Sequence, residues 1–396
     1  MLATPKLQFK EVTANFTDWT DFILSDLAIE IQGGGTPSRD VTEFWNGDIS
    51  WVTIKDLISS NFNETQEYIT SAGVENSATN IVPAGTLIVA TRINVGKCKI
   101  YNVDVAINQD LKAIFFKQEV STLFMQYWFE KNFQKIQNYG SGSTVMGIQL
   151  ETLRNFVVWL PKKSEQEKIA NFLSAIDTLI RLQRRKVELL KDYFIGVIVT
   201  IFSNVENEGE YCKFSDCFVK GKAGGTPKTT VREYYNGDIP FMSISDMTRQ
   251  GKYITYTKKV ISKDGLCNSS AWLVPEGSLI LSMYASVGFT SINKIPLTTS
   301  QAMFSMTFND ILLRDYIHYY FCFYRRRKMS SYIERGTQGN INADFIRGID
   351  IPMVKNEEIQ VFVNMLSTLD ELIFKEEKKV AQLESFKSGL IAQMFV

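Results

Sequence analysis

Two long segments of the chain carry apolar residues that alternate at spacings of four and three. The first series starts at Ile169 and continues with Leu173, Ile176, Ile180, Gln183, Val187, Leu190, Phe194, Val197 and Ile201. The second series comprises Phe362, Leu366, Leu369, Ile373, Glu376, Val380, Leu383, Lys387, Leu390 and Met394. This spacing is typical of a coiled-coil seam, and about 33 residues of helix span roughly 50 Å. Because an isolated helix cannot bury such a seam, we expect the two helices to pair. The simpler alternative is that each helix packs only on its own domain.

A polar residue occupies the fifth of the ten core positions in each helix. These residues are Gln183 and Glu376. In an antiparallel pair they would lie side by side at the midpoint. We predict that they form a hydrogen bond there and fix the register of the two helices.

The rest of the chain alternates short apolar runs with turn residues. Four runs rich in β-branched or aromatic residues and bounded by Gly, Pro, Asn or Asp predict strands, at 49–54, 86–91, 112–116 and 156–160. Residues 121–137 and 311–326 carry apolar side chains at helical spacing, which predicts two further helices.

The chain contains one sequence unit twice. Six matches occur in the same order at shifts of about 190 to 193 positions: 34–37 with 224–227, 45–49 with 235–239, Asp56 with Asp246, 82–88 with 274–280, Gln109 with Gln301, and 173–180 with 366–373. The turns and strand ends are shared, whereas the residues between them differ. This pattern indicates one scaffold that presents two different surfaces.

These patterns predict an α+β protein with two tandem β-rich domains, each followed by a long helix. The two helices are expected to pair as an antiparallel coiled coil with pseudo-twofold symmetry. The predicted segments are a first module at 1–162, a first helix at 163–203, a linker at 204–210, a second module at 211–354 and a second helix at 355–396.

Composition and motifs argue against an enzyme. His318 is the only histidine and lies in an aromatic, helix-like stretch, so we interpret it as structural and exclude histidine triads and histidine-rich metal sites. The chain has no phosphate-binding G-x-x-x-x-G-K-[ST] loop and no Pro-Pro pair of the kind with which amino-methyltransferases hold a base. The acidic residues around Asp370 fall inside a charged helix, where surface pairing explains them. We predict no catalytic residue, no metal and no bound cofactor.

The sequence further predicts a cytoplasmic protein without a membrane segment. Its longest apolar stretch, 194–202, is far shorter than the ~20 residues that cross a bilayer, and no secretion signal is recognisable. Five cysteines without a C-x-x-C pair fit reduced thiols. The formal net charge is +0, so a nucleic-acid-binding function would require segregated charge.

The duplicated blocks resemble the specificity subunits of type I restriction–modification enzymes. The resemblance covers nearly the whole chain, from the opening PKLQF at 5–9 to the Pro-then-Glu-rich entry of each long helix. It implies two target-recognition domains that read a two-part, asymmetric site in double-stranded DNA with a non-specific gap. It also implies docking of two methyltransferase subunits and of restriction/translocase subunits. S-adenosylmethionine, ATP and magnesium would be bound by those partners.

Side chains on loops at the shared turns are the candidate DNA contacts. The first module offers Thr36, Ser38, Arg39, Lys55, Arg92, Asn94, Ser141 and Ser143. The second module offers Thr226, Lys228, Ser245, Tyr284, Arg335, Thr337, Gln338 and Asn340. Lys55 aligns with Ser245 and Arg92 with Tyr284, so the two modules should read different bases.

Simpler interpretations stay open for several of these features. The Gly-Gly runs at 34–35 and 224–225 would serve only to supply positive φ, Arg92 would form an internal salt bridge, and the basic residues 325–328 would be a solvated helix end rather than a phosphate clamp. The aromatic run 319–324 is interpreted as core.

Two other functions stay possible at this point. One is a protein-interaction scaffold that pairs helices and does not read DNA, which the neutral net charge favours. The other is the recognition part of a DNA methyltransferase or nuclease, which the missing motifs disfavour.

Overall fold

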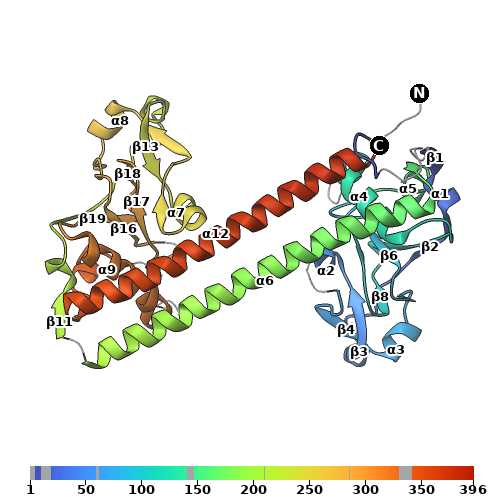
Figure 1. The fold of residues 1–396 in the computed structure, drawn as a ribbon, viewed down its shortest axis with the longest axis horizontal. Coiled ribbons are helices and arrows are strands. Elements are labelled where there is room, and N and C mark those ends of the chain that lie inside the picture. The colour runs from blue at the N-terminus through green and yellow to red at the C-terminus, as the bar shows by residue number, and fades with distance from the viewer. Residues whose placement is uncertain are drawn as a thin grey trace. The chain divides into compact units, whose positions relative to one another are not determined.

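The chain divides into two compact units. Unit 1 consists of Met1–Gln183 and Lys379–Val396, and unit 2 of Arg184–Lys378. The computed structural model describes residues 5–9, 19–58, 62–140, 147–208, 210–284, 286–329 and 341–396. Two long helices, α6 (Lys163–Glu208) and α12 (Asn356–Met394), each contribute residues to both units (Figure 1).

The first module is built from two small sheets and short helices. One sheet has the order β2-β9-β6-β7 and the other β4-β3-β8-β5, while β1 pairs with β10. The strands are β1 (Thr20–Ile23), β2 (Ala28–Gly33), β3 (Trp45–Val52), β4 (Glu67–Ile69), β5 (Asn80–Val82), β6 (Leu87–Ala90), β7 (Cys98–Ile100), β8 (Val105–Ile107), β9 (Leu111–Phe116) and β10 (Val157–Leu160). The helices are α1 (Leu24–Leu27), η1 (Thr42–Phe44), α2 (Ile54–Ile58), α3 (Ser71–Glu75), α4 (Thr122–Gln137) and α5 (Leu150–Arg154).

The second module repeats this plan with two changes: β14 is added to one sheet, and the counterpart of β5 is reduced to an isolated bridge between Val274 and Leu297. Its sheets have the orders β12-β19-β16-β17-β14 and β15-β13-β18, and β11 pairs with β20. The strands are β11 (Glu210–Lys213), β12 (Lys220–Ala223), β13 (Ile239–Met242), β14 (Tyr253–Ile254), β15 (Lys259–Ile261), β16 (Leu279–Ser282), β17 (Thr290–Asn293), β18 (Thr298–Thr299), β19 (Met303–Thr307) and β20 (Asp350–Met353). The helical segments are η2 (Phe214–Asp216), η3 (Arg232–Tyr235), α7 (Ile244–Gln250), α8 (Lys263–Cys267), α9 (Ile311–Tyr324), η4 (Arg325–Met329) and α11 (Ala343–Arg347).

The central strand of each module is buried on both faces. In β6, Leu87 and Val89 pack in the cluster that contains α4, whereas Ile88 and Ala90 pack against residues of the second sheet. Successive strand residues point to opposite faces, so this division follows from the alternation along the strand. An entirely apolar run such as Leu87–Ala90 therefore marks a strand between two layers.

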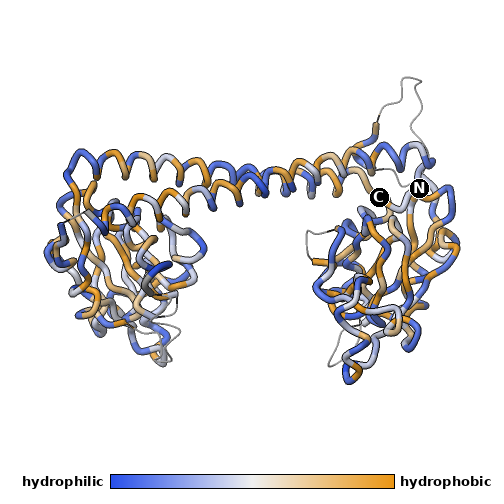
Figure 2. Tube along the Cα trace, turned by 90° about the horizontal axis from the view of Figure 1, so that it is seen from below, coloured by the Kyte–Doolittle hydropathy of each residue, from blue (hydrophilic) through white to orange (hydrophobic). Residues whose placement is uncertain are grey.

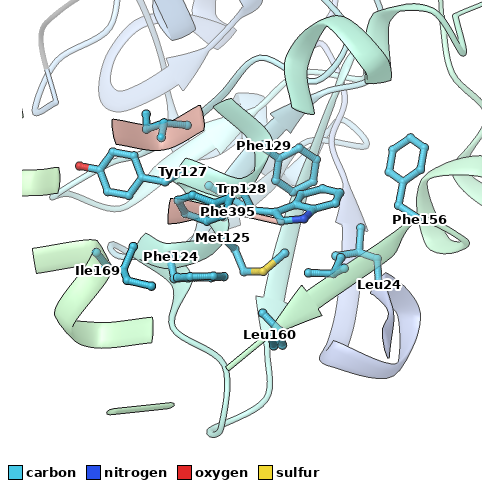
Figure 3. Packing of buried hydrophobic residues seen from close by; sticks show 14 of the residues in the cluster. Leu24, Phe124, Met125, Tyr127, Trp128, Phe129, Phe156, Leu160, Ile169 and Phe395 are labelled. Atoms are coloured by element: carbon cyan, nitrogen blue, oxygen red, sulfur yellow. The ribbon is translucent and has the colours of Figure 1, made fainter. Parts of the chain in front are cut away.

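The apolar seams of α6 and α12 are buried in the core of each unit. In unit 1, Ile169 and Leu173 of α6 and Met394 of α12 belong to one apolar cluster with Phe124 and Tyr127 of α4. Figure 3 shows Ile169, Phe124 and Tyr127 of this cluster. Figure 2 shows apolar and polar residues alternating along both helices. Every seam position named above is buried or half-buried, so the predicted seams are confirmed.

Unit 2 has the same arrangement with the roles of the helices exchanged. Here Ile201 and Phe202 near the end of α6, and Leu366 near the start of α12, pack around Tyr316 and Tyr320 of α9. The helices thus run antiparallel within each unit, as predicted. The simpler alternative is wrong in one respect, because each helix packs on a module and also pairs with the other helix.

An ion-pair cluster joins α4, α6 and α12 in unit 1. The hydroxyl of Tyr127 donates a hydrogen bond to Asp177 at 2.6 Å. Lys387 lies 2.8 Å from Asp177 and bonds both carboxylate oxygens of Glu130 at 2.9 and 3.0 Å. Burial opposes the charge on Lys387, but the two carboxylates outweigh it and raise the pKa of this lysine.

Unit 2 keeps the tyrosine–aspartate bond and changes the cation. The Tyr319 hydroxyl donates to Asp370 at 2.8 Å. The lysine beside this pair is Lys252, whose Nζ lies 2.6 Å from the Tyr319 hydroxyl and 3.8 Å from Asp370. Lys252 comes from the module, whereas Lys387 comes from a long helix. Phe194 of α6 packs edge-on against Tyr319 at 6.1 Å.

Two sequence predictions about the helices have different outcomes. Helix α6 continues to Glu208, so the predicted linker 204–210 is wrong for its first five residues; burial of Val205 in the unit 2 core extends the seam. Glu376 is 3% exposed and pairs with Lys186 at 3.2 Å. Gln183 is half-buried on α6, and its bond to Glu376 stays a prediction.

His318 is structural, as predicted. Its ring is 4% exposed, and its Nδ1 lies 2.9 Å from the hydroxyl of Thr290. Burial lowers its pKa well below 6.5, so the ring is neutral at pH 7. The aromatic residues of 319–324 are core, also as predicted.

Replacing Lys387 by Met should destabilise unit 1. The variant leaves Asp177 and Glu130 without their shared cation, and we expect the free energy of unfolding to fall by about 1–2 kcal/mol. Urea unfolding followed by tryptophan fluorescence measures this, because unit 1 holds Trp19, Trp45, Trp51, Trp128 and Trp159. Lys375→Met, at an exposed site on α12, is the control. Equal losses in the two variants would contradict a role for the cluster.

Candidate nucleic-acid interface

The candidate residues of the first module gather where several strands begin or end. Because β2, β9, β6 and β7 are antiparallel neighbours, the ends of β2 and β6 and the starts of β7 and β9 share one edge of the sheet. Thr36 follows β2, Arg92 and Asn94 follow β6, and Gln109 precedes β9. Strand topology alone therefore brings these four residues together.

The second sheet adds Lys55 to the same edge. Strands β3 and β8 are parallel and both end there, and the backbone N–H of Asn108 bonds the carbonyl of Val52 at 3.2 Å. Lys55 lies on α2, which follows β3, and its side chain is exposed. We define the polar edge of the first module as Thr36, Lys55, Arg92, Asn94 and Gln109.

One side-chain hydrogen bond is present at the polar edge of both modules. The Thr36 hydroxyl donates to Oε1 of Gln109 at 2.5 Å, and the Thr226 hydroxyl donates to Oε1 of Gln301 at 2.5 Å. This bond fixes the glutamine amide so that its nitrogen faces away from the threonine. The polar edge of the second module is defined in the same way as Thr226, Ser245, Tyr284 and Gln301.

The Gly-Gly runs are needed for close packing rather than for positive φ. None of these four glycines has a positive φ. A Cβ on Gly34 would lie 1.9 Å from the carbonyl oxygen of Ile107, and one on Gly224 would lie 2.2 Å from that of Thr299. The interpretation as positive-φ turns is therefore wrong, because the backbone passes too close to a strand end for any side chain.

A buried carboxylate shapes the helix that presents Lys55 or Ser245. Asp56 is 1% exposed and accepts hydrogen bonds from the Thr53 backbone N–H at 2.8 Å and the Thr53 hydroxyl at 2.7 Å. Asp246 accepts the matching pair from Ser243, at 2.9 and 2.7 Å. Such caps satisfy N–H groups that a helix start leaves unbonded.

A buried lysine supports α2 from below. Lys99 is 3% exposed, and its Nζ donates to the carbonyl oxygen of Asp56 at 2.9 Å. Its ammonium also lies 4.6 Å from the centre of the Tyr101 ring. Burial lowers the pKa of Lys99 to about 8 despite the nearby charge of Asp56. In the second module Ser291 stands at the matching position and donates to Gly251 at 2.5 Å.

Arg92 is held in place by an acidic neighbour and remains largely exposed. Its guanidinium lies 3.6 Å from Asp110, with 62% of the side chain accessible, so the proposed internal salt bridge is present. Lys112 lies close by, and burial followed by the charge of Arg92 lowers its pKa. The first polar edge thus carries several cations around Thr36 and Gln109.

Arg39 lies near this edge, but its guanidinium is bonded within the protein to Glu67 and packs on Trp45. It bonds both oxygens of Glu67, at 2.5 and 3.0 Å, and stacks 3.7 Å above the Trp45 ring. The hydrogen bond from Arg39 lowers the pKa of Glu67. The carbonyl of Ser38 accepts a bond from Trp45 at 2.9 Å, so residues 38–39 anchor a turn.

The second polar edge has a different set of side chains. Lys228 is exposed where the first module has Ser38, and Ser245 bonds the hydroxyl of Ser243 at 2.8 Å. Tyr284 is half-exposed and accepts a bond from Ser282 through its carbonyl at 2.8 Å. In the basic run, Arg325 stacks 3.7 Å above Phe289, and Arg327 bonds Ser203 at 2.7 Å.

Six candidates lie outside the described residues: Ser141, Ser143, Arg335, Thr337, Gln338 and Asn340. The first apolar residues described after these two segments, Ile148 and Ile341, lie close to the polar edges. The Ile148 N–H bonds the carbonyl of Thr91 at 2.8 Å, and the Ile341 N–H bonds that of Met283 at 3.1 Å. Ile148 and Ile341 therefore lie beside the residues that immediately precede Arg92 and Tyr284.

The described part of the chain offers no other obvious chemical centre. Within it, no three His, Cys, Asp or Glu side chains are grouped as metal ligands would be. The helices in those same ranges lack the combined length and apolar character required for crossing a bilayer.

Comparison with known proteins identifies the family. The family model described as the type I restriction modification DNA specificity domain matches residues 17–192 and again 207–385. The chain belongs to this family. The specificity subunit of the type I restriction enzyme MjaIX from Methanocaldococcus jannaschii is 24% identical over 407 residues, which cover 95% of this chain and 92% of that subunit. The EcoR124I/EcoR124II specificity subunit of Escherichia coli is 28% identical over 178 residues, 40% of this chain and 44% of that one.

Solved structures share the fold of this specificity subunit. The S subunit of a type I restriction–modification system from M. genitalium matches with a TM-score of 0.61 at 14% identity, covering 100% of this chain and 99% of that one. A chain from a type I system studied for complex assembly matches with a TM-score of 0.56, covering 95% and 97%. This specificity subunit has two DNA-recognition domains and is a non-catalytic component of a type I system.

Sequence reasoning missed two residues of the polar edges and one residue buried beneath α2. Gln109 and Gln301 were matched between the repeats, but only the structure pairs each with a threonine. Lys99 has no sequence signal, because a lysine two residues before a tyrosine in a short strand looks exposed.

The lowered pKa of Lys99 predicts a pH-dependent stability. The folded protein releases the proton near pH 8 and the unfolded chain near 10.5, so the free energy of unfolding should rise between these values. Over this pH range we expect the free energy of unfolding of the wild type to rise by about 1–3 kcal/mol more than that of Lys99→Met. Urea unfolding at several pH values measures the difference. Lys117→Met, at an exposed site, should retain the rise; a parallel response in Lys99→Met would refute the assignment.

Proposed function

We propose that this specificity subunit reads an asymmetric, two-part site in double-stranded DNA, one part with each module. The observation that carries the proposal is the pair of polar edges, which share a scaffold and differ in the side chains that they expose. Lys55 stands where the second module has Ser245, and Arg92 stands where it has Tyr284. Two unlike surfaces on one scaffold suit two unlike half-sites.

The shared residues fit contacts to the DNA backbone, and the differing ones fit base reading. Phosphate contacts carry no sequence information, so a residue that makes them can be the same in both modules. The bonded pairs Thr36–Gln109 and Thr226–Gln301 meet this condition. Arg92, Asn94 and Tyr284 differ between the modules and are the candidates for base edges.

The long helices carry exposed apolar residues that fit partner proteins. In unit 1, Leu179 and Leu182 of α6 are 54% and 56% exposed; in unit 2, Val361 and Met365 of α12 are 61% and 39% exposed. Leu179 corresponds to Leu372 in the repeat, which is 36% exposed. Equivalent apolar sites on both helices suit two copies of one partner, for which we propose the methyltransferase subunits.

The remaining partners follow from the same proposal. The restriction/translocase subunits would join the assembly of specificity and methyltransferase subunits in the cytoplasm. S-adenosylmethionine, ATP and magnesium would be bound by those subunits rather than by this chain.

DNA binding by the complex with its methyltransferase subunits tests the proposal. For the complex we expect specific binding, with a binding constant whose logarithm falls steeply as the logarithm of the salt concentration rises. For the chain alone we expect weak binding. Arg92→Ala should relax one half of the methylated site, and Tyr284→Ala the other half, each by about 1–3 kcal/mol of base discrimination. Mapping methylated adenines in cells reads out both variants. A complex that assembles without salt-dependent DNA affinity would favour the interaction-scaffold alternative.

We further propose that the paired helices set the gap between the half-sites. Inserting one heptad into both α6 and α12 adds roughly 10 Å of helix, near three base pairs at about 3.4 Å each. The methylated motif should then have a longer gap and unchanged half-sites. Insertion into α6 alone is the control, because it shifts the seam register and should abolish specific methylation. An unaltered motif after the double insertion would rule the idea out.

A further inference from the structure

The turn between β6 and β7 holds an isoleucine in a conformation that isoleucine avoids. Ile93 has φ +47° and Asn94 has φ +51°. Left-handed φ at two consecutive turn residues favours Gly, Asn or Asp, and for a β-branched residue it is an outlier. A better-suited residue at position 93 would relieve this strain, so the side chain itself requires an explanation.

Packing does not explain Ile93. Its side chain is 50% exposed, whereas Val95, two residues later, is 1% exposed and belongs to the module core. The turn is held by main-chain bonds, from Gly96 to Ala90 at 2.9 Å and from Lys97 to Asn94 at 2.9 Å. The fold therefore keeps the turn in place and leaves the aliphatic group of Ile93 accessible to solvent.

The neighbours of Ile93 place it at the candidate DNA surface. Arg92 precedes it with an exposed guanidinium 3.6 Å from Asp110, and Asn94 follows it. In the major groove, arginine suits guanine, asparagine suits adenine, and an aliphatic group suits the methyl group of thymine. Only the major groove exposes that methyl group, so an aliphatic residue between two polar readers has a specific partner there.

We propose that Ile93 is a specificity-determining residue that contacts the C5-methyl group of a thymine in the half-site read by the first module. This inference rests on the proposed function and extends it to one residue and one functional group. The second module has Ser286 at the position of Asn94, also with positive φ (+56°), and Ala285 in the sequence where Ile93 stands. Positive φ at this turn position is thus shared by the two modules, while the large aliphatic side chain of Ile93 belongs to the first module.

Deoxyuridine in place of thymine removes the methyl group alone and gives a direct test. Binding of the complex with methyltransferase subunits is measured on the mapped target with each thymine replaced in turn. With the wild type we expect uridine at one position, in a single half-site, to lower the affinity of the complex about 4-fold. This loss corresponds to the free energy of burying one carbon group. With Ile93→Ala the penalty at that position should fall below about 2-fold.

Two further variants separate base reading from a structural role. Ile93→Val keeps a branched aliphatic group and should keep the uridine penalty. Ile93→Gly relieves the left-handed strain, so its melting temperature should stay the same or rise by about 2–4 °C while the penalty disappears. Ser286→Ala is the matched control in the second module and should leave the penalty unchanged.

The outcomes distinguish failure of this inference from failure of the proposed function. If the complex binds its site specifically and no thymine in either half-site is sensitive to uridine, the role of Ile93 is overturned and the proposed function stands. If uridine lowers the affinity of the Ile93→Ala variant as much as that of the wild type, the role of Ile93 is overturned as well. Loss of affinity in Ile93→Ala that is the same for thymine and uridine would indicate a wedge between bases, which also overturns the methyl contact. Absence of specific binding by the wild type would refute the proposed function itself.

Discussion

The fold depends on the burial of two long apolar seams that neither module can cover alone. In unit 1 the start of α6 and the end of α12 enclose α4, and in unit 2 the end of α6 and the start of α12 enclose α9. Each helix therefore contributes to two hydrophobic cores. A change that weakens the pairing of the helices removes apolar contacts from both cores, because Ile169 and Ile201 lie on one continuous helix. The duplicated sequence is explained by this demand, since each half supplies one module and one of the two helices.

The repeat has kept the contact that joins module to helix and has changed its surroundings. Tyr127–Asp177 and Tyr319–Asp370 are the same bond in the two units. In unit 1 the balancing cation is Lys387, which arrives from the other half of the repeat; at the corresponding position α6 has Phe194, which packs on Tyr319. If α6 paired with another copy of α6 instead of with α12, a phenylalanine rather than a lysine would lie beside Asp177. The halves have become unequal partners, which favours pairing of a first half with a second half.

Periodicity and repetition predicted most of the fold, because both are properties of the sequence itself. The seams, the central strands and the helices that start at Thr122 and Ile311 follow from spacing alone. What spacing could not predict is which polar groups meet across long separations. Thr36 and Gln109 are 73 residues apart, and their bond depends on the order of strands in two sheets. The role of Gly34 was predicted wrongly for the same reason, since the carbonyl that excludes a side chain there belongs to Ile107, 73 residues later. The end of α6 was misplaced because Val205 is buried by the module that follows it.

The same contacts explain how a chain with no net charge can serve DNA recognition. Several cations are used inside the protein: Lys387 in the unit 1 cluster, Lys252 beside Tyr319, and Arg314, whose side chain is 9% exposed and pairs with Asp315 at 2.7 Å. Such groups would release no counterions from DNA, so we expect the sequence-independent part of the chain's DNA affinity to be small. On the proposed function, discrimination between DNA sequences would then depend on a few exposed side chains of the polar edges. On the proposed function, the other members of the assembly would supply the electrostatic attraction to DNA that this chain lacks, and the chain without them would bind DNA weakly.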